Sequence, residues 1–187
     1  GLCKLFQKEV DDRNPRDNFF HCLVNAAQQF HNRKNGSETY LLSGYPWFKS
    51  RARDTFVSLP GLTLAIDERD YFERVMVTAE KGYRSVINGK PLSVEISEID
   101  QPDVPLWAVW AIQQYAKTVG DEKCIKKYGK FVSDMMNFII SGKHPYLRLD
   151  DNNLLYVDGK GKVMTWMNST VNGKPVTPRS GYIVEVN

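Results

Sequence analysis

The stretch from Asp54 to Arg84, "DTFVSLPGLTLAIDERDYFERVMVTAEKGYR", joins two segments of different hydrophobic pattern. In the first, residues 54–66, apolar side chains leave almost no polar face, and a helix that is apolar all round is buried all round. We expect Asp54 to cap this helix, and Pro60 to kink or break it. Periodicity alone leaves a strand open for this segment.

The second segment, residues 67–84, is amphipathic, and the alternation extends in both directions along the chain. Its apolar stripe consists of Tyr71, Phe72, Val75, Met76, Ala79 and Tyr83. Residues 104–119 again read as an apolar helix, and residues 121–142 as an amphipathic one. Residues 14–36 read as a further amphipathic helix that ends at Asn35-Gly36, with Asn14 as N-cap and Pro15 at its first position. We therefore predict an all-α fold of helical hairpins in two concentric layers, with the apolar helices inside.

The remaining segments are predicted to be a hairpin and three loops. Residues 146–166 alternate in polarity around Asp-Gly and Lys-Gly turns, which predicts a small β-hairpin. The loops 44–53, 88–103 and 165–181 each precede an inner element. If the inner helices are parallel, the three loops meet at one rim, beside the positive ends of the helix dipoles.

Composition limits the function classes. The 187 residues predict a single domain, and 25 Lys and Arg against 22 Asp and Glu are too balanced for a nucleic-acid binder. No run of apolar residues is long enough to span a membrane. Three cysteines without metal-ligand spacing fit a reduced, cytoplasmic setting, and no metal or other cofactor is expected.

The predicted rim combines aromatic rings with carboxylates and guanidinium groups. Its residues are Tyr45, Trp47, Phe48, Arg51, Arg53, Asp54, Glu95, Glu98, Asp100, Asp103, Trp166, Asn168 and Arg179. The C–H face of a sugar packs on an indole, and its hydroxyl groups need charged or polar partners. Two carboxyl groups are also the minimum for glycoside hydrolysis, in which one is a protonated general acid. The rim therefore favours a carbohydrate ligand.

Structural explanations stand beside this functional one. Arg53 and Asp54 could form only a salt bridge and an N-cap, and an Asp before an apolar helix, such as Asp103, is by default an N-cap. Trp107 and Trp110 lie within an apolar helix, where packing in the core is the expected role. Trp47 and Trp166 lie in loops, where packing and binding are both open. The three histidines are not read as ligands.

Three segments resemble the C-terminal amylo-α-1,6-glucosidase domain of glycogen debranching enzymes. They are "GYPWFKSRARDTFVSLPGLTLA" at 44–65, "DQPDVPLWAVWAIQQY" at 100–115 and "MTWMNSTVNGKPVTPRSGYIVEVN" at 164–187. The family pattern reads approximately GYPWF, GRDTF and SLPG, then VDA and LWF, then TWMD, VTPR and VEIN, and the similarity covers residues 17–187 in order. The resemblance implies an (α/α)6 barrel and inverting removal of the α-1,6-linked glucose at a glycogen branch.

The resemblance also implies roles for individual residues. It makes Trp47, Arg53, Asp54 and Arg179 substrate-binding residues, to which the rim adds Glu98 and Trp166. The family's general acid is the Asp of TWMD, but Asn168 stands at that position, and an amide cannot protonate a leaving oxygen. The acid is then lost, replaced, or supplied by Asp103 or Glu98.

The chain is shorter than the family's domain. It provides about half of the barrel, without the Glu that serves the family as general base, so we expect it to be inactive alone and to self-associate through its uncovered helices. Its expected partner is an α-glucan. Two other hypotheses remain: a catalytically silent α-glucan-binding domain, and a purely structural helical protein.

Overall fold

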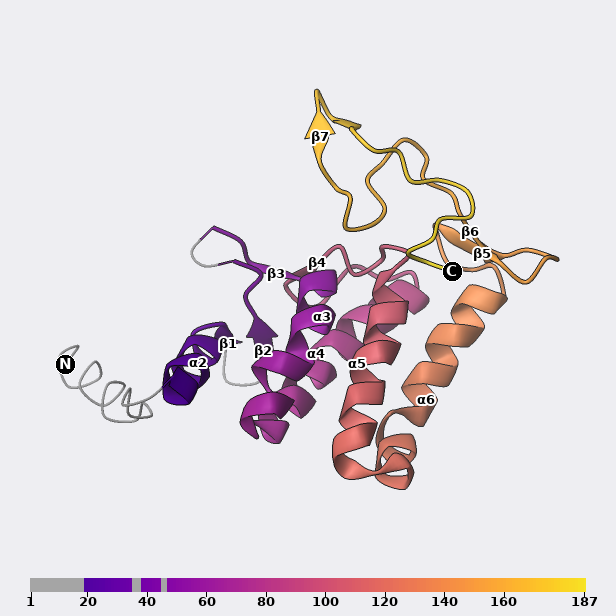
Figure 1. Ribbon diagram of the computed structural model, residues 1–187. Coiled ribbons are helices and arrows are strands. Elements are labelled where there is room, and N and C mark those ends of the chain that lie inside the picture. The colour runs from indigo at the N-terminus through magenta and orange to yellow at the C-terminus, as the bar shows by residue number, and fades with distance from the viewer. Residues whose placement is uncertain (1–18, 35–37, 45–46) are drawn as a thin grey trace.

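The computed structural model describes residues 19–34, 38–44 and 47–187, and four helices form its main body. This helical body consists of α3 (Ala52–Leu62), α4 (Arg69–Ile87), α5 (Val104–Val119) and α6 (Asp121–Ile140). Helices α3 and α5 run in one direction, and α4 and α6 in the other (Figure 1). The amino ends of α3 and α5 therefore lie at the same end of the body. A helical fold is confirmed, with short strand pairs added to it.

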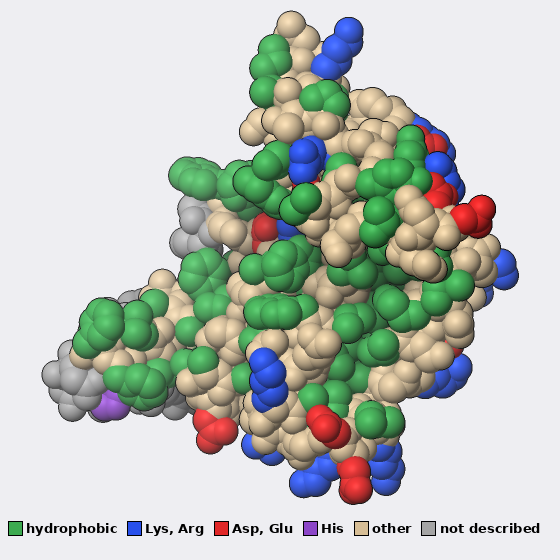
Figure 2. Space-filling view, turned by 45° about the vertical axis from the view of Figure 1, so that its right-hand side comes forward, with side chains coloured by type: hydrophobic (Ala, Val, Ile, Leu, Met, Phe, Trp, Pro, Cys, Tyr) green, Lys and Arg blue, Asp and Glu red, His purple; other side chains and the backbone are tan. Residues whose placement is uncertain are grey.

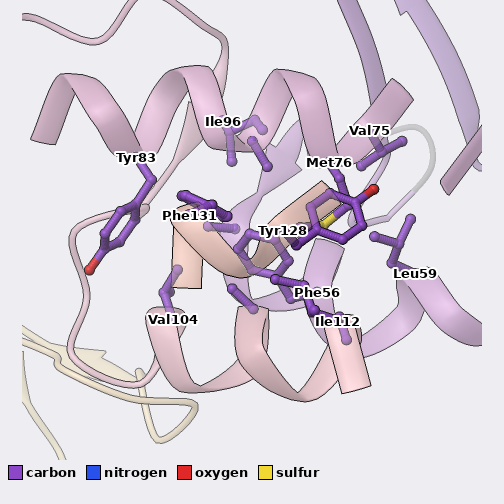
Figure 3. Close-up of a cluster of buried hydrophobic side chains, with 14 of the residues drawn as sticks. Phe56, Leu59, Val75, Met76, Tyr83, Ile96, Val104, Ile112, Tyr128 and Phe131 are labelled. Atoms are coloured by element: carbon purple, nitrogen blue, oxygen red, sulfur yellow. The ribbon is translucent and has the colours of Figure 1, made fainter. Parts of the chain in front are cut away.

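The core of the helical body lies between the four helices (Figure 3). Helix α3 contributes Phe56 and Leu59, and both are fully buried. The predicted stripe of α4 is buried along its whole length, and the ring of Phe72 stacks on that of Tyr115, with centroids 5.0 Å apart. The apolar side of α6, with Cys124, Tyr128, Phe131, Met135 and Ile139, is also buried. The amphipathic helices therefore face the core as their hydrophobic period predicts.

The expectation that the apolar helices are buried on every side is wrong for this chain. On α3, Val57 is 41% exposed. On α5, Trp107 and Trp110 are only half-buried, although their rings pack edge to face with centroids 5.6 Å apart. Both helices therefore keep part of an apolar side accessible to solvent. Helix α3 also runs through Pro60 and ends at Leu62, where the short 3-10 helix η1 (Leu64–Ile66) follows.

The helix predicted for residues 14–36 is shorter than expected. Helix α2 (Phe19–Gln28) is followed by β1 (His31–Lys34), which pairs antiparallel with β2 (Glu38–Leu41). Strand β2 is held on the body by Tyr71, whose hydroxyl donates to the carbonyl of Tyr40 at 3.0 Å. Helix α2 lies beyond this hairpin and keeps Phe19 and Phe20 exposed (Figure 1). The proposed cap at Asn14-Pro15 and the Asn35-Gly36 turn lie outside the described residues.

The remaining strands lie at the end of the body that carries the amino ends of α3 and α5 (Figure 1). Strands β3 (Ser50–Arg51) and β4 (Ile96–Ser97) pair in parallel. The predicted hairpin is confirmed as β5 (Leu147–Leu149) and β6 (Leu155–Val157). The loop predicted for residues 165–181 contains a further pair, β7 (Thr170–Val171) and β8 (Lys174–Pro175). We call residues 142–187 the C-terminal segment.

Candidate functional site

A cleft of about 550 Å³, here called the aromatic cleft, is lined by one side of α3, by Trp107 in the first turn of α5 and by Trp166 of the C-terminal segment, with Phe30, Leu42 and Ser43 beside the β1–β2 hairpin. Four of its lining residues carry the chemistry: Arg53, Asp54, Trp107 and Trp166. Figure 2 shows a recess between the C-terminal segment and the body, where acidic and basic side chains lie among hydrophobic ones. A cleft of this size, apolar with a few polar groups, is typical of small-molecule sites of about 300–1,000 Å³. Segments that are distant in the sequence thus meet at one end of the fold.

Arg53 forms the buried polar wall of the aromatic cleft. Its side chain is 6% exposed, and Nε and Nη2 donate to the two carboxylate oxygens of Asp103, at 2.5 and 3.0 Å. Nη2 also donates to the side-chain oxygen of Gln101. A two-point contact of this kind fixes both position and orientation of the guanidinium plane. The Arg53–Asp103 pair therefore ties the start of α3 to the start of α5.

Asp103 lies behind this wall rather than in the cleft. Its side chain is 1% exposed, and both oxygens accept bonds from Arg53. It occupies the N-cap position of α5 but makes no side-chain capping bond, because its carboxylate points to Arg53 instead. Both of its oxygens are therefore engaged in a buried ion pair, and removing one partner of such a pair typically costs about 3–5 kcal/mol.

Asp54 is the carboxylate that faces the aromatic cleft. The expectation that it caps the helix is wrong, because α3 starts two residues earlier, with Arg51 at the N-cap position. The side chain lies instead in the first turn, half-buried and among the lining residues. Within the described part of the chain it has no hydrogen-bond or ion-pair partner. Its oxygens are therefore available to accept hydroxyl hydrogens.

The two tryptophans that line the cleft come from different parts of the chain. Trp166, 58% exposed, belongs to the C-terminal segment, and Trp107 belongs to α5. The sequence predicted that Trp107 packs in the core. Its backbone N–H donates to the carbonyl of Asp103, one helical turn earlier. That spacing puts it on the same side of α5 as Asp103, which is the signal that could have identified it. Gln101, whose side-chain oxygen accepts from Arg53, was not predicted as a site residue either.

Two other predicted residues lie outside the lining of the aromatic cleft. Trp47 is 81% exposed and has no ring contact with another described residue. Asn168 is half-buried, and its backbone N–H donates to the carbonyl of Trp166 at 2.9 Å, which closes a tight turn beside the cleft. Asn168 therefore shapes the loop that carries Trp166.

Arg179 braces the C-terminal wall. Its Nε donates to Oε1 of Glu185 at 2.7 Å, and the hydroxyl of Thr165 donates to the same oxygen at 2.8 Å. The bonds from Arg179 lower the pKa of Glu185 to about 2. This clasp of Thr165, Arg179 and Glu185 fixes the chain one residue before Trp166, so Arg179 positions the tryptophan.

Glu98 lies on the far side of Arg53 from the aromatic cleft. Its Oε2 is 3.9 Å from Nη1 of Arg53, and its Oε1 is 4.0 Å from Nε of Arg51. These distances are too long for hydrogen bonds. Two of the three predicted loops, 44–53 and 88–103, thus meet at one polar cluster, formed by Arg51, Arg53, Glu98, Gln101 and Asp103.

Among the described residues, no group of three or more His, Cys, Asp or Glu side chains could hold a metal ion. In the same part of the chain, the helices are too short or too polar to cross a membrane.

Comparison with known proteins gives one finding. Neither curated proteins nor solved structures yielded a match to the chain. The model of the family described as amylo-alpha-1,6-glucosidase matches residues 24–187, which include every residue of the aromatic cleft. This chain therefore belongs to the amylo-alpha-1,6-glucosidase family.

Proposed function

We propose that the chain binds a glucose unit of an α-glucan in the aromatic cleft, as part of a domain that removes α-1,6-linked glucose at branch points with inversion. The observation that carries this proposal is the lining itself. Two indole rings, from Trp107 and Trp166, line the cleft together with Asp54, a carboxylate that has no partner within the described part of the chain. Indoles pack on the C–H faces of a sugar ring while the carboxylate accepts its hydroxyl hydrogens.

Arg53 and Asp103 serve this site as positioning residues. Arg53 donates three bonds to protein acceptors, so its main contribution is to hold the first turn of α3, and with it Asp54, against α5. We propose the same kind of role for Arg179 and Asn168 on the loop that bears Trp166. Trp47 would join a bound glucan only beyond the cleft, where its exposed ring can contact a further sugar unit.

Binding is tested by calorimetric titration with glucose and maltohexaose. Trp166→Ala and Asp54→Asn are each expected to weaken glucose binding about 10-fold or more, since each removes one principal contact. Asp151→Asn is the matched control, because Asp151 is exposed on the β5–β6 turn. Unchanged affinity in both cleft variants, alongside an intact fold, would support a purely structural protein and overturn the proposal.

A catalytically silent binding domain is the second candidate, and Asn168 favours it. An inverting glycosidase needs a protonated carboxyl group and a second carboxylate about 6.5–9.5 Å away. Asn168 cannot supply the proton, and Asp103 is engaged with Arg53. Release of glucose from limit dextrin should be compared between the chain and its Asn168→Asp variant. Glucose release that appears only in the Asn168→Asp variant would contradict the silent domain, because it would show that the proton donor alone is missing.

A further inference from the structure

A second cleft, of about 460 Å³, adjoins the aromatic cleft across the polar cluster. We call it the acidic cleft. Its lining residues are Glu98, Asp100, Gln101, Tyr146, Gly161, Lys162, Val163, Met164, Thr170 and Gly173. Gln101 lines this cleft while its side chain accepts from Arg53, which lines the other. In the C-terminal segment, Met164 lines the acidic cleft and Trp166 lines the aromatic cleft. The two clefts are therefore linked through contacting residues, Gln101 of one and Arg53 of the other.

Glu98 adopts a strained backbone conformation at the wall of the acidic cleft. Its φ is 59°, in the left-handed region that residues other than glycine rarely adopt. Such a conformation costs about 1–3 kcal/mol and persists only where the surroundings enforce it. The four other described non-glycine residues with positive φ are Asp67, Asn153, Lys160 and Asn172, and none of them lines either cleft.

The neighbours of Glu98 on both sides enforce this conformation. Before it, Ile96 and Ser97 pair with β3, and the hydroxyl of Ser97 donates to the carbonyl of Ser50 at 3.2 Å. After it, Ile99 is fully buried against α4 at Gly82, where even an added Cβ would lie 3.0 Å from Cδ1 of Ile99. The chain is thus fixed at both ends, and the carboxylate of Glu98 is held between two arginines.

The carboxylate of Glu98 lacks hydrogen-bond donors. In the described part of the chain neither of its oxygens accepts a hydrogen bond, and Oε2 is fully buried. A buried polar atom without a partner typically costs about 1–3 kcal/mol, and more when it is charged. Two arginines at about 4 Å lower its Coulomb energy without satisfying its lone pairs. Strain and an unsatisfied oxygen at one residue beside a cleft together indicate a ligand site.

We propose that the acidic cleft holds a second sugar unit of the glucan bound in the aromatic cleft, and that Glu98 accepts hydrogen bonds from its hydroxyl groups. This inference rests on the proposed function for the identity of the ligand. Hydroxyl groups fit better than ions do. The two arginines oppose a cation, and Glu98 and Asp100 oppose an anion. A hydroxyl donates to the carboxylate and can accept from Nη1 of Arg53.

The test compares glucose with maltohexaose by calorimetry. Glucose fills the aromatic cleft, whereas maltohexaose is long enough to occupy both. We expect Glu98→Gln to weaken maltohexaose binding about 10-fold, as for the loss of a hydrogen bond to a charged group, and to leave glucose binding within 2-fold. Glu95→Gln is the matched control, because Glu95 is exposed and pairs with Lys34 on the far side of β4.

A second variant separates ligand binding from a structural role. Glu98→Gly removes the carboxylate and the side chain that strains the backbone, so the melting temperature should not fall below the parent's while maltohexaose binding weakens. A clear fall in melting temperature with unchanged maltohexaose affinity would mean that Glu98 only stabilises the arginines, and would overturn the inference. Failure of the parent chain to bind glucose would overturn the proposed function itself. If the parent chain binds glucose and maltohexaose with equal affinity, only the proposed second site in the acidic cleft is overturned.

Discussion

The helical body and the C-terminal segment each supply one wall of the aromatic cleft, but different forces hold them. The body is stabilised by a continuous buried cluster to which all four of its helices contribute. The C-terminal segment has only a small cluster, built around Val157, Met164 and Ile183. It relies on polar contacts, chiefly the clasp of Thr165, Arg179 and Glu185 and the bonds between Asn187 and Leu155.

This difference teaches that the two walls respond to different perturbations. Hydrophobic burial hardly depends on pH, whereas contacts between charged groups vary with protonation. Helices α3 and α5, and Trp107 with them, should therefore keep their arrangement under conditions that release Trp166. The following predictions test that contrast, from the largest expected effect to the smallest.

Removing a core ring should destabilise the body most. Phe72→Ala deletes a fully buried ring that stacks on Tyr115, and it should lower the free energy of unfolding by about 3–5 kcal/mol. Urea denaturation measures the change. Phe20→Ala, at an exposed ring of α2, should change it by less than about 0.5 kcal/mol. Equal losses in the two variants would contradict the assignment of the core.

Two glycines in the body should respond to alanine with opposite signs. At Gly82, an added Cβ would lie 2.6 Å from Cγ2 of Val94, so Gly82→Ala should cost about 1–3 kcal/mol through overpacking. At Gly129 the nearest atom would be 3.4 Å away, and Gly129→Ala should stabilise α6 by about 0.5–1 kcal/mol. The melting temperatures of both variants measure these changes. If both substitutions stabilise the protein, the 88–103 loop, which contributes Val94 and Ile99, packs more loosely against Gly82 than in this structure.

The junction between the two regions should weaken as the pH falls from about 6.5 to 4. His144 is buried there, and burial lowers its pKa to about 4. Because the unfolded chain binds a proton more readily, the neutral ring stabilises the fold above pH 6.5, and that stability, about 1–3 kcal/mol, is lost on acidification. His144→Asn should remove this part of the pH dependence, which urea denaturation at pH 7, 5.5 and 4 can measure. If the free energy of unfolding falls equally in parent and variant between pH 7 and 4, groups other than His144 cause the pH dependence.

The smallest effect is expected at the clasp of Thr165, Arg179 and Glu185, and it should be confined to the C-terminal segment. The lowered pKa of Glu185 contributes stability above about pH 4.5, which is lost as the pH falls toward 2. Arg179→Met should raise hydrogen exchange of amides in residues 155–187 at pH 6 and leave those of α4 and α6 protected. Lys174→Met, at an exposed lysine of β8, is the control. Faster exchange throughout the body would show that the two regions unfold together.

The sequence predicted the body better than the cleft, for physical reasons. The stripes of α4 and α6 follow the helical period because one face of each helix meets the core. Trp107 was assigned to the core because its apolar neighbours suggested burial on every side, which depends on elements that pack against α5. The partners of Asp103 could not be predicted, because an Asp at an N-cap position is usually bound to its own helix, and only the fold brings Arg53 within reach. The (α/α)6 barrel itself remains a prediction.

The charge balance of the polar cluster has a consequence for selectivity. The cluster's two guanidinium groups, Arg51 and Arg53, are matched by two carboxylates, Glu98 and Asp103. Asp54 adds a third carboxylate, without an ion-pair partner in the described part of the chain, at the aromatic cleft. A phosphate ester on a sugar would meet uncompensated negative charge there. Phosphorylated glucans should therefore be discriminated against relative to their neutral counterparts, most strongly at low ionic strength.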